Sequence, residues 1–339
     1  MSLLTVRHLT VYRYSEPVGL GEHRMMFRPR ESHDLRLIKT NLEITPVPAS
    51  LRWLHDVFDN SVAVATFDGE TSELRFDSTV TLEHVETALP EYPLEEYATA
   101  YPFRYSDDEL PNLSCALVQQ YPSDDVRRWV KQFLDPSGRT GTIDLLRAIT
   151  LGVKRDFRYM RRSEKGVQSP HQTLESRRGS CRDFAVLMIE AVRSLGLAAR
   201  FVSGYIFAPD AAHAAIRVES PNAVPNGAPH EPPPRTLGGG ATHAWMQAYL
   251  PGTGWIDFDP TNSIIGNRNL IRVAVAWDPK QVLPLWGTFA GKASSFLGMD
   301  VTVSVTEADL GDRRDYDQDD DGSTLEARTM KRFGAAPAK

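Results

Sequence analysis

The sequence is poor in cysteine and has no long apolar run. Its only cysteines, Cys115 and Cys181, stand among 339 residues. Residues 1–17 lack the charged head and apolar stretch of a signal peptide. A disulfide framework is therefore not expected, and each thiol has to be judged alone. Because no segment reaches the roughly 18 apolar residues of a membrane-spanning helix, we expect a cytoplasmic protein with no membrane partner.

An excess of positive charge is also missing. The chain has 38 Lys and Arg against 44 Asp and Glu, a net charge of -6, so it lacks the basic footprint of nucleic-acid binding. Hydrophobic residues at 41% and charged residues at 24% are ordinary for a globular protein with a buried core. The length favours two domains. Nothing in the sequence indicates the oligomeric state.

Strand patterns fill the first part of the chain. Residues 3–14 alternate in the manner of a strand, with Leu4, Val6, His8, Thr10 and Tyr12 on one face. Later segments with strand-like composition, at 35–44, 62–67 and 74–82, are separated by Gly, Pro and Asp-Asn turn signals. We expect residues 1–88 to form an antiparallel β-sandwich domain. Four prolines interrupt residues 89–112, which predicts a linker.

Helical patterns take over at about residue 113. Apolar residues recur at helical spacing in 124–134 and 142–157, and a third helix is predicted from Cys181. Strand-like segments follow, at 199–205, 243–250, 254–258, 270–277 and 301–306. Helices followed by strands predict an α+β domain over residues 113–307.

Two segments have the composition of irregular chain. Residues 208–241 are rich in Pro, Ala and Gly, which predicts a long loop with a candidate short strand at 215–219. The loop is either a lid over the active site or a surface insertion. Residues 308–339 are highly charged and almost free of apolar residues, which predicts a disordered tail.

Cys181 is the candidate nucleophile. It follows Gly179-Ser180, and Ser180 and Asp183 have the S-x-x-D spacing of a capping box, so the helix should begin at residue 180 or 181. The first turn of a helix stabilises a thiolate, the reactive form of cysteine. The alternative for any cysteine is a buried structural role, and we assign that role to Cys115.

His243 is the candidate base. It begins the alternating segment 243–250, and the turn at 251–254 returns the chain as a second strand. That hairpin places a late carboxylate of the second strand near His243. Asp257 and Asp259 share one face, so spacing alone does not choose between them; each could also be a turn or capping aspartate.

Four blocks together resemble bacterial proteins of the transglutaminase-like superfamily: Gly179 to Phe184, Arg200 to Tyr205, Thr242 to Trp245, and Trp255 to Asn262. Residues 53–60 and the β-rich start resemble the N-terminal domain of many of these enzymes. The resemblance implies a papain-like α+β core and gives the third triad role to Asp259. The chain departs from the family at Arg182, where Gln is usual, which could alter substrate preference.

The chemistry that follows is amide-bond cleavage by Cys181, His243 and Asp259. The Cys181 N–H is the first expected oxyanion donor, and Tyr159 is the candidate for the second. We expect a peptide or protein substrate, a thioester intermediate and hydrolysis by water, in the manner of a peptidase or amidase. Transfer to an amine would use the same residues, and a non-catalytic binding module is the alternative of a different class. No cofactor is expected, and the ligand spacing of a metal site is missing.

Overall fold

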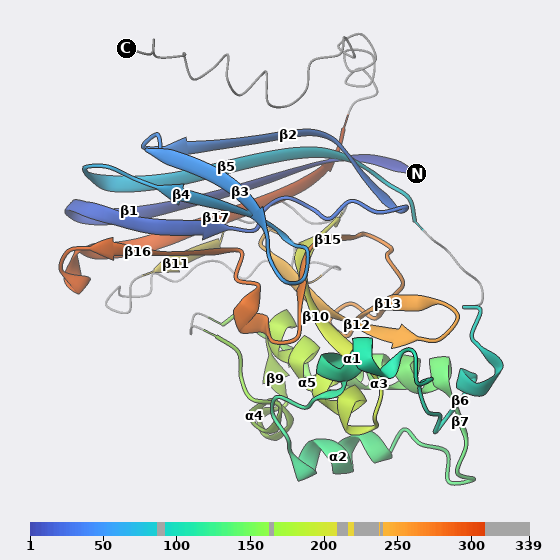
Figure 1. Cartoon of the computed structure of the whole chain (residues 1–339). Coiled ribbons are helices and arrows are strands. Elements are labelled where there is room, and N and C mark those ends of the chain that lie inside the picture. The colour runs from blue at the N-terminus through green and yellow to red at the C-terminus, as the bar shows by residue number, and fades with distance from the viewer. Residues whose placement is uncertain (87–91, 163–165, 209–215, 220–236, 238–239, 309–339) are drawn as a thin grey trace, which may run out of the picture.

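The computed structural model describes residues 1–86, 92–162, 166–208, 216–219, 237 and 240–308. One large β-sheet assembly lies on one side of the molecule, a smaller sheet lies in the middle, and the helices cover the opposite side (Figure 1). The α+β class is confirmed. None of the helices in this part of the chain has the length and apolarity that a bilayer-crossing helix needs.

The larger sheet has eight antiparallel strands: β1 (Ser2–Met25), β2 (Leu35–Thr45), β3 (Ser50–His55), β4 (Ser61–Thr66), β5 (Glu70–His84), β11 (Ile216–Glu219), β16 (Leu285–Ala290) and β17 (Phe296–Glu307). The first half of β1 pairs with β5 and β17. Its second half pairs with β4 and β16. Strand β1 therefore links two groups of strands, and a core of apolar residues from β1, β2, β4 and β5 packs between them, with Ile44, Ala63 and Phe76 among its members.

The strand pairing crosses the sequence boundaries that we predicted for the domains. Residues 285–307 were expected within the catalytic domain, yet they form strands β16 and β17 of the N-terminal sheet. Residues 216–219, within the predicted loop, add β11 to the edge of β17. The rest of the proposed lid lies outside the described residues except at 208, 237 and 240–241, and so does the tail after residue 308. The domain boundaries themselves stay a prediction.

The smaller sheet has five antiparallel strands in the order β14-β13-β12-β10-β15. Their bounds are β10 (Ala199–Ile206), β12 (His243–Leu250), β13 (Gly254–Asp259), β14 (Ile264–Ile265) and β15 (Leu270–Ala276). The helices are α1 (Leu110–Leu117), α2 (Asp124–Lys131), α3 (Thr142–Asp156), α4 (Pro170–Ser176) and α5 (Cys181–Ser194), with short 3-10 turns at Glu96–Ala98, Pro279–Gln281 and Ala293–Ser295. The segments between the helices form two short two-stranded sheets. One pairs β6 (Ala100–Tyr101) with β7 (Thr140–Gly141), and the other pairs β8 (Arg158–Tyr159) with β9 (Arg178–Gly179).

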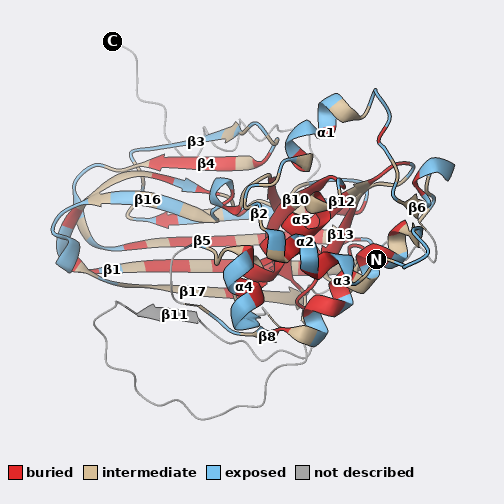
Figure 2. Ribbon diagram, turned by 90° about the horizontal axis from the view of Figure 1, so that it is seen from below, coloured by how far each residue is buried: buried red, intermediate tan, exposed pale blue. Residues whose placement is uncertain are grey.

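Helix α5 is the buried centre of this half of the molecule (Figure 2). Its apolar face, with Phe184, Leu187, Met188 and Val192, packs against β10 and β12 in the largest hydrophobic cluster. Full burial of such side chains stabilises the fold by about 1.5–3 kcal/mol each. The helix is therefore fixed against the strand that begins at His243.

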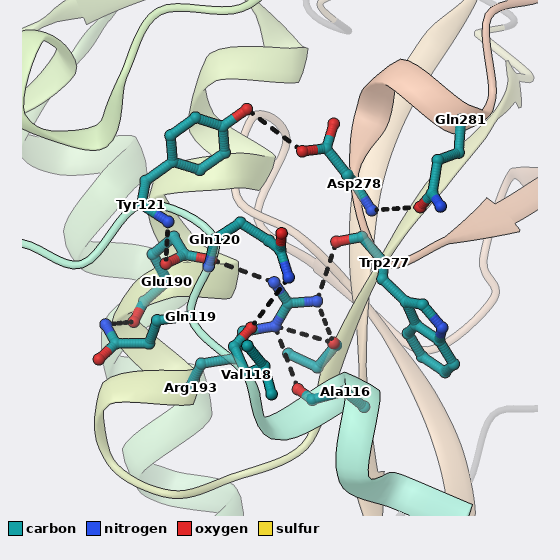
Figure 3. A network of polar contacts seen from close by, with 11 residues as sticks. Ala116, Val118, Gln119, Gln120, Tyr121, Glu190, Arg193, Trp277, Asp278 and Gln281 are labelled. Atoms are coloured by element: carbon teal, nitrogen blue, oxygen red, sulfur yellow. Dashed lines mark hydrogen bonds and ion pairs between the residues drawn. The ribbon is translucent and has the colours of Figure 1, made fainter.

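A buried ion pair holds the last turns of α5 (Figure 3). Glu190 Oε1 and Arg193 Nη1 are 3.1 Å apart, and each side chain is 1% exposed. Arg193 also donates to three backbone carbonyls, those of Ala116, Ala199 and Trp277. Glu190 accepts from the backbone N–H groups of Gln120 and Tyr121. The network ties α5 to α1, to β10 and to the end of β15.

Candidate active site

Cys181 is the first residue of α5, as the sequence predicted. Ser180 before it has an extended backbone, and its N–H and hydroxyl donate to the Asp183 carboxylate at 2.8 and 2.9 Å. This contact fixes the helix start at Cys181. The N–H groups of the first turn have no intrahelical partner and carry partial positive charge. A thiolate at Cys181 is stabilised by that charge, although the residue is only 7% exposed.

The hairpin of β12 and β13 brings His243 and Asp259 together. Its register pairs Met246 with Phe258, which makes His243 and Asp259 diagonal neighbours on one face. His243 Nε2 donates to Asp259 Oδ2 at 2.8 Å. Both side chains are fully buried, so water does not weaken their interaction.

Further donors hold the Asp259 carboxylate. The backbone N–H of Thr261 donates to Oδ1 at 2.8 Å, and Asn262 Nδ2 donates to Oδ2 at 2.8 Å. Burial alone would raise the pKa of Asp259, but the charge of His243 and these hydrogen bonds lower it. Asp259 is therefore held as a carboxylate that can orient the imidazole and stabilise its charged form.

The second ring nitrogen of His243, Nδ1, is buried and makes no hydrogen bond among the described residues. The Cys181 thiol is close enough for the two groups to shift each other's pKa. Burial would raise the pKa of the Cys181 thiol, but its interaction with His243, the charge of Arg182 and the backbone N–H of Ala244 together lower it. Burial would lower the pKa of His243, but Asp259 and Cys181 raise it to about 10. Both shifts favour a thiolate–imidazolium pair.

Asp257 has different partners. Its Oδ1 accepts from Trp245 Nε1 at 2.6 Å, and its Oδ2 accepts from Arg272 Nη1 at 3.0 Å. The Trp245 ring stacks on the His243 ring with centroids 5.9 Å apart. Asp257 thus holds the residue beside the imidazole and does not contact the imidazole itself. The structure brings together Cys181, His243 and Asp259 and leaves Asp257 outside this set.

Tyr159 lies close to the thiol. The parallel ladder of β8 and β9 pairs Tyr159 with Gly179, two residues before Cys181. Burial raises the pKa of the Tyr159 phenol, and the negative charge of a Cys181 thiolate raises it further. The phenol therefore keeps its proton and can donate a hydrogen bond. Its role as an oxyanion donor stays a prediction.

Cys115 does not have the buried position that we predicted. It lies in α1 and is exposed, because the buried face of this helix carries Leu113 and Ala116 instead. Among the described residues, no cluster of three or more His, Cys, Asp or Glu side chains could hold a metal ion.

Sequence reasoning missed Asn262, which connects the triad to the chain before β12. Its amide donates to Asp259 and also to the Leu237 carbonyl at 3.0 Å, while its Oδ1 accepts from the Leu237 N–H at 2.8 Å. The Asp-Pro-Thr-Asn block that carries the family resemblance contains this residue. An amide side chain three positions after a buried aspartate was the available signal.

Two protein-family models match this chain, one in its N-terminal part and one over the candidate triad. Residues 4–83 match the family described as the bacterial transglutaminase-like N-terminal region. Residues 130–260 match the transglutaminase-like superfamily. All three residues of the candidate triad fall within the second match.

Mycobacterial proteins resemble most of this chain. An uncharacterized protein of Mycobacterium tuberculosis is 27% identical over 320 residues, which is 90% of this chain and 93% of that protein. An uncharacterized protein of Mycobacterium leprae is 25% identical over 322 residues, which is 89% of this chain and 98% of that protein. The crystal structure of a candidate cysteine protease from Cytophaga hutchinsonii has a TM-score of 0.61 at 18% identity, covering 91% of this chain and 92% of that chain. The last similarity shows a shared fold.

Proposed function

Because residues 130–260 of this chain belong to the transglutaminase-like superfamily, we propose that the protein is a cysteine-nucleophile enzyme that hydrolyses amide bonds. One observation carries the proposal. Asp259 holds Nε2 of the buried His243, and His243 lowers the pKa of the Cys181 thiol, which stands at a helix start. This combination is the arrangement that activates a cysteine nucleophile.

The first half of the reaction forms a thioester. The Cys181 thiolate attacks the carbonyl carbon of a carboxamide, and the carbonyl oxygen becomes an oxyanion. The Cys181 N–H donates to it, with Tyr159 as the proposed second donor; loss of one such donor typically costs about 3 kcal/mol. The His243 imidazolium then gives its proton to the leaving amine, the C–N bond breaks, and the acyl group stays on sulfur.

The second half releases the product. Neutral His243 takes a proton from water, the resulting nucleophile attacks the thioester, and the C–S bond breaks to give a carboxylic acid and the thiolate. Asp259 stabilises the imidazolium form of His243 each time it forms. An amine in place of water would give transfer by the same steps. We favour hydrolysis because water is always present; the peptide or protein substrate and the cytoplasmic location stay predictions.

Mass spectrometry of product peptides tests the proposal. A mixture of glutamine-containing peptides is incubated with the protein and a fluorescent primary amine. Hydrolysis gives a cleaved peptide or a glutamate in place of glutamine, whereas transfer gives a peptide that carries the amine. Both activities should vanish in Cys181→Ala and His243→Ala. Turnover that persists in Cys181→Ala would overturn the proposal, and binding without turnover would favour a non-catalytic module.

A further inference from the structure

A second candidate site lies between the two sheets, away from the triad. A cavity of about 360 Å³ opens between residues 30–34, which connect β1 to β2, and strands β10, β12, β13 and β15 of the smaller sheet. This volume is within the range of pockets for small ligands, about 300–1,000 Å³. Three arginines line it: Arg30, Arg200 and Arg272.

Arg200 has a largely desolvated charge without a carboxylate partner. Its Nε donates to the neutral amide oxygen of Gln247 at 2.8 Å, and its guanidinium lies over the Trp255 ring at 4.0 Å from the centroid. No acidic side chain in the described part of the chain forms an ion pair with it. Burial lowers the pKa of Arg200 to about 9; the positive charges of Arg30 and Arg272 add to this effect, and the charge of Asp257 opposes it. On balance, its surroundings destabilise the Arg200 charge.

Arg30 also forms no ion pair with any residue that the structure describes. Its Nη1 donates to the Phe58 carbonyl at 2.8 Å and to Asn60 Oδ1 at 3.0 Å, which are neutral acceptors. Burial lowers the pKa of Arg30, the charges of Asp59 and Asp56 partly oppose this, and the charge of Arg272 lowers the pKa further. Two guanidinium groups that line the cavity, those of Arg30 and Arg200, thus have only neutral hydrogen-bond acceptors among the described residues.

The acidic groups of the cavity have other partners. Asp34 and Asp257 both form ion pairs with Arg272, at 2.5 and 3.0 Å. Glu31 accepts from the Leu37 N–H at 3.0 Å, and its second oxygen lies 3.8 Å from Arg28. The direct contacts of these carboxylates therefore go to Arg272, Arg28 and the Leu37 N–H, and none of the three forms an ion pair with Arg30 or Arg200.

We propose that this cavity binds a small anion with a carboxylate or phosphate group between Arg30 and Arg200. The planar guanidinium presents paired N–H donors that match both anion types, and such charge-assisted hydrogen bonds are about twice as strong as neutral ones. Trp255 and Gln247 fix the orientation of the Arg200 group before the ligand arrives, which reduces the entropic cost of binding.

The anion site is separate from the catalytic one. Gln247 is four residues from His243 along β12, a distance of about 13 Å at 3.3 Å per residue. Ligand binding should therefore be unchanged in Cys181→Ala. This variant separates the anion site from the proposed amide chemistry, because the two hypotheses can then fail independently.

Calorimetric titration of the full-length protein at constant ionic strength tests the site, with inorganic phosphate and succinate as probes. We expect saturable binding of at least one probe, with a Kd at least about tenfold weaker in Arg200→Gln and in Arg30→Gln. The control is Arg128→Gln, since Arg128 is 76% exposed on α2, and it should bind like the wild type. Circular dichroism checks that each variant is folded. If Arg200→Gln does not fold, Arg30→Gln still tests the site.

The two probes identify the anion chemistry. Binding of phosphate alone, of succinate alone or of both supports the proposal and defines which group the arginines select. Absence of binding of either probe to the wild type at about 10 mM would overturn it. Equal affinity of the wild type and a folded Arg30→Gln or Arg200→Gln variant would overturn it as well.

Discussion

The indole Nε1 of Trp245 and the Oδ1 of Asp257 are 2.6 Å apart, and this hydrogen bond keeps Asp257 out of the catalytic set. His243 is left with Asp259 as its carboxylate partner. The two aspartates, two residues apart on one strand face, therefore have separate tasks. One supports the Trp245 ring under the imidazole, and the other orients the imidazole.

Asparagine substitutions should separate these tasks. We expect Asp259→Asn to slow alkylation of Cys181 by about tenfold or more near neutral pH, because the carboxylate that raises the pKa of His243 is lost. Asp257→Asn should change this rate by about twofold at most and lower the melting temperature instead. Iodoacetamide kinetics and thermal unfolding measure both effects. A larger effect of Asp257→Asn on alkylation would contradict the assignment.

The pH dependence of alkylation follows from the lowered pKa of Cys181. The thiolate persists as the pH falls below the ordinary thiol value of about 8.5 and is lost only at the lower folded-state pKa. In a Cys115→Ser background, the rate with iodoacetamide should stay high at about pH 6. His243→Ala removes the positive charge, so its rate should fall at a higher pH than in the parent. Coincident pH profiles for the two proteins would be inconsistent with the thiolate–imidazolium pair.

The buried pair Glu190 and Arg193 should matter more than any surface pair. Arg193→Met leaves the Glu190 carboxylate buried without its counter-charge, and we expect a loss of about 3–5 kcal/mol in the free energy of unfolding. The matched control is Arg128→Met, which removes an exposed pair with Asp125 and should cost less than about 1 kcal/mol. Urea unfolding measures both values. Similar losses for the two variants would refute this account of the α5 anchor.

Gly204 of β10 leaves no room for a side chain beside Trp245 and the Ile271 backbone. A Cβ added there would be 2.1 Å from the Ile271 carbonyl oxygen and 2.7 Å from the Trp245 ring. We expect Gly204→Ala to destabilise the protein by about 1–3 kcal/mol and to slow Cys181 alkylation. Gly19→Ala is the control, because its new Cβ would contact only Ala290, at 3.6 Å from the Cβ and 3.9 Å from the carbonyl oxygen, which are ordinary van der Waals distances. Equal melting temperatures for the two variants would show that the strand accommodates the methyl group.

Much of the local structure could be predicted from periodicity. The start of α5 at Cys181 and the hairpin of β12 and β13 follow from a capping pattern and a Pro-Gly turn, both of which act within a few residues. Hairpin geometry then brings His243 near two aspartates. It could not choose between them, because the choice depends on Trp245 and Arg272, and Arg272 comes from another strand.

Long-range pairing was the part that the sequence did not reveal. Strands β16 and β17 return to β1 from residues about 260 to 300 positions away, and no local pattern specifies which sheet a strand joins. The prediction that Cys115 is buried failed for a related reason, since the orientation of α1 against its neighbours decides which of its residues are buried. The cavity arginines likewise meet only after both sheets have packed.

The most direct test of the central claim is mass spectrometry after reaction with an electrophilic glutaminyl probe. The probe mimics a carboxamide substrate and forms a stable bond only with an activated nucleophile. The account predicts a single adduct on Cys181 in the folded protein, which is lost in His243→Ala and after unfolding in urea. An adduct on Cys115 alone, or labelling of Cys181 that is unaffected by His243→Ala, would contradict the account.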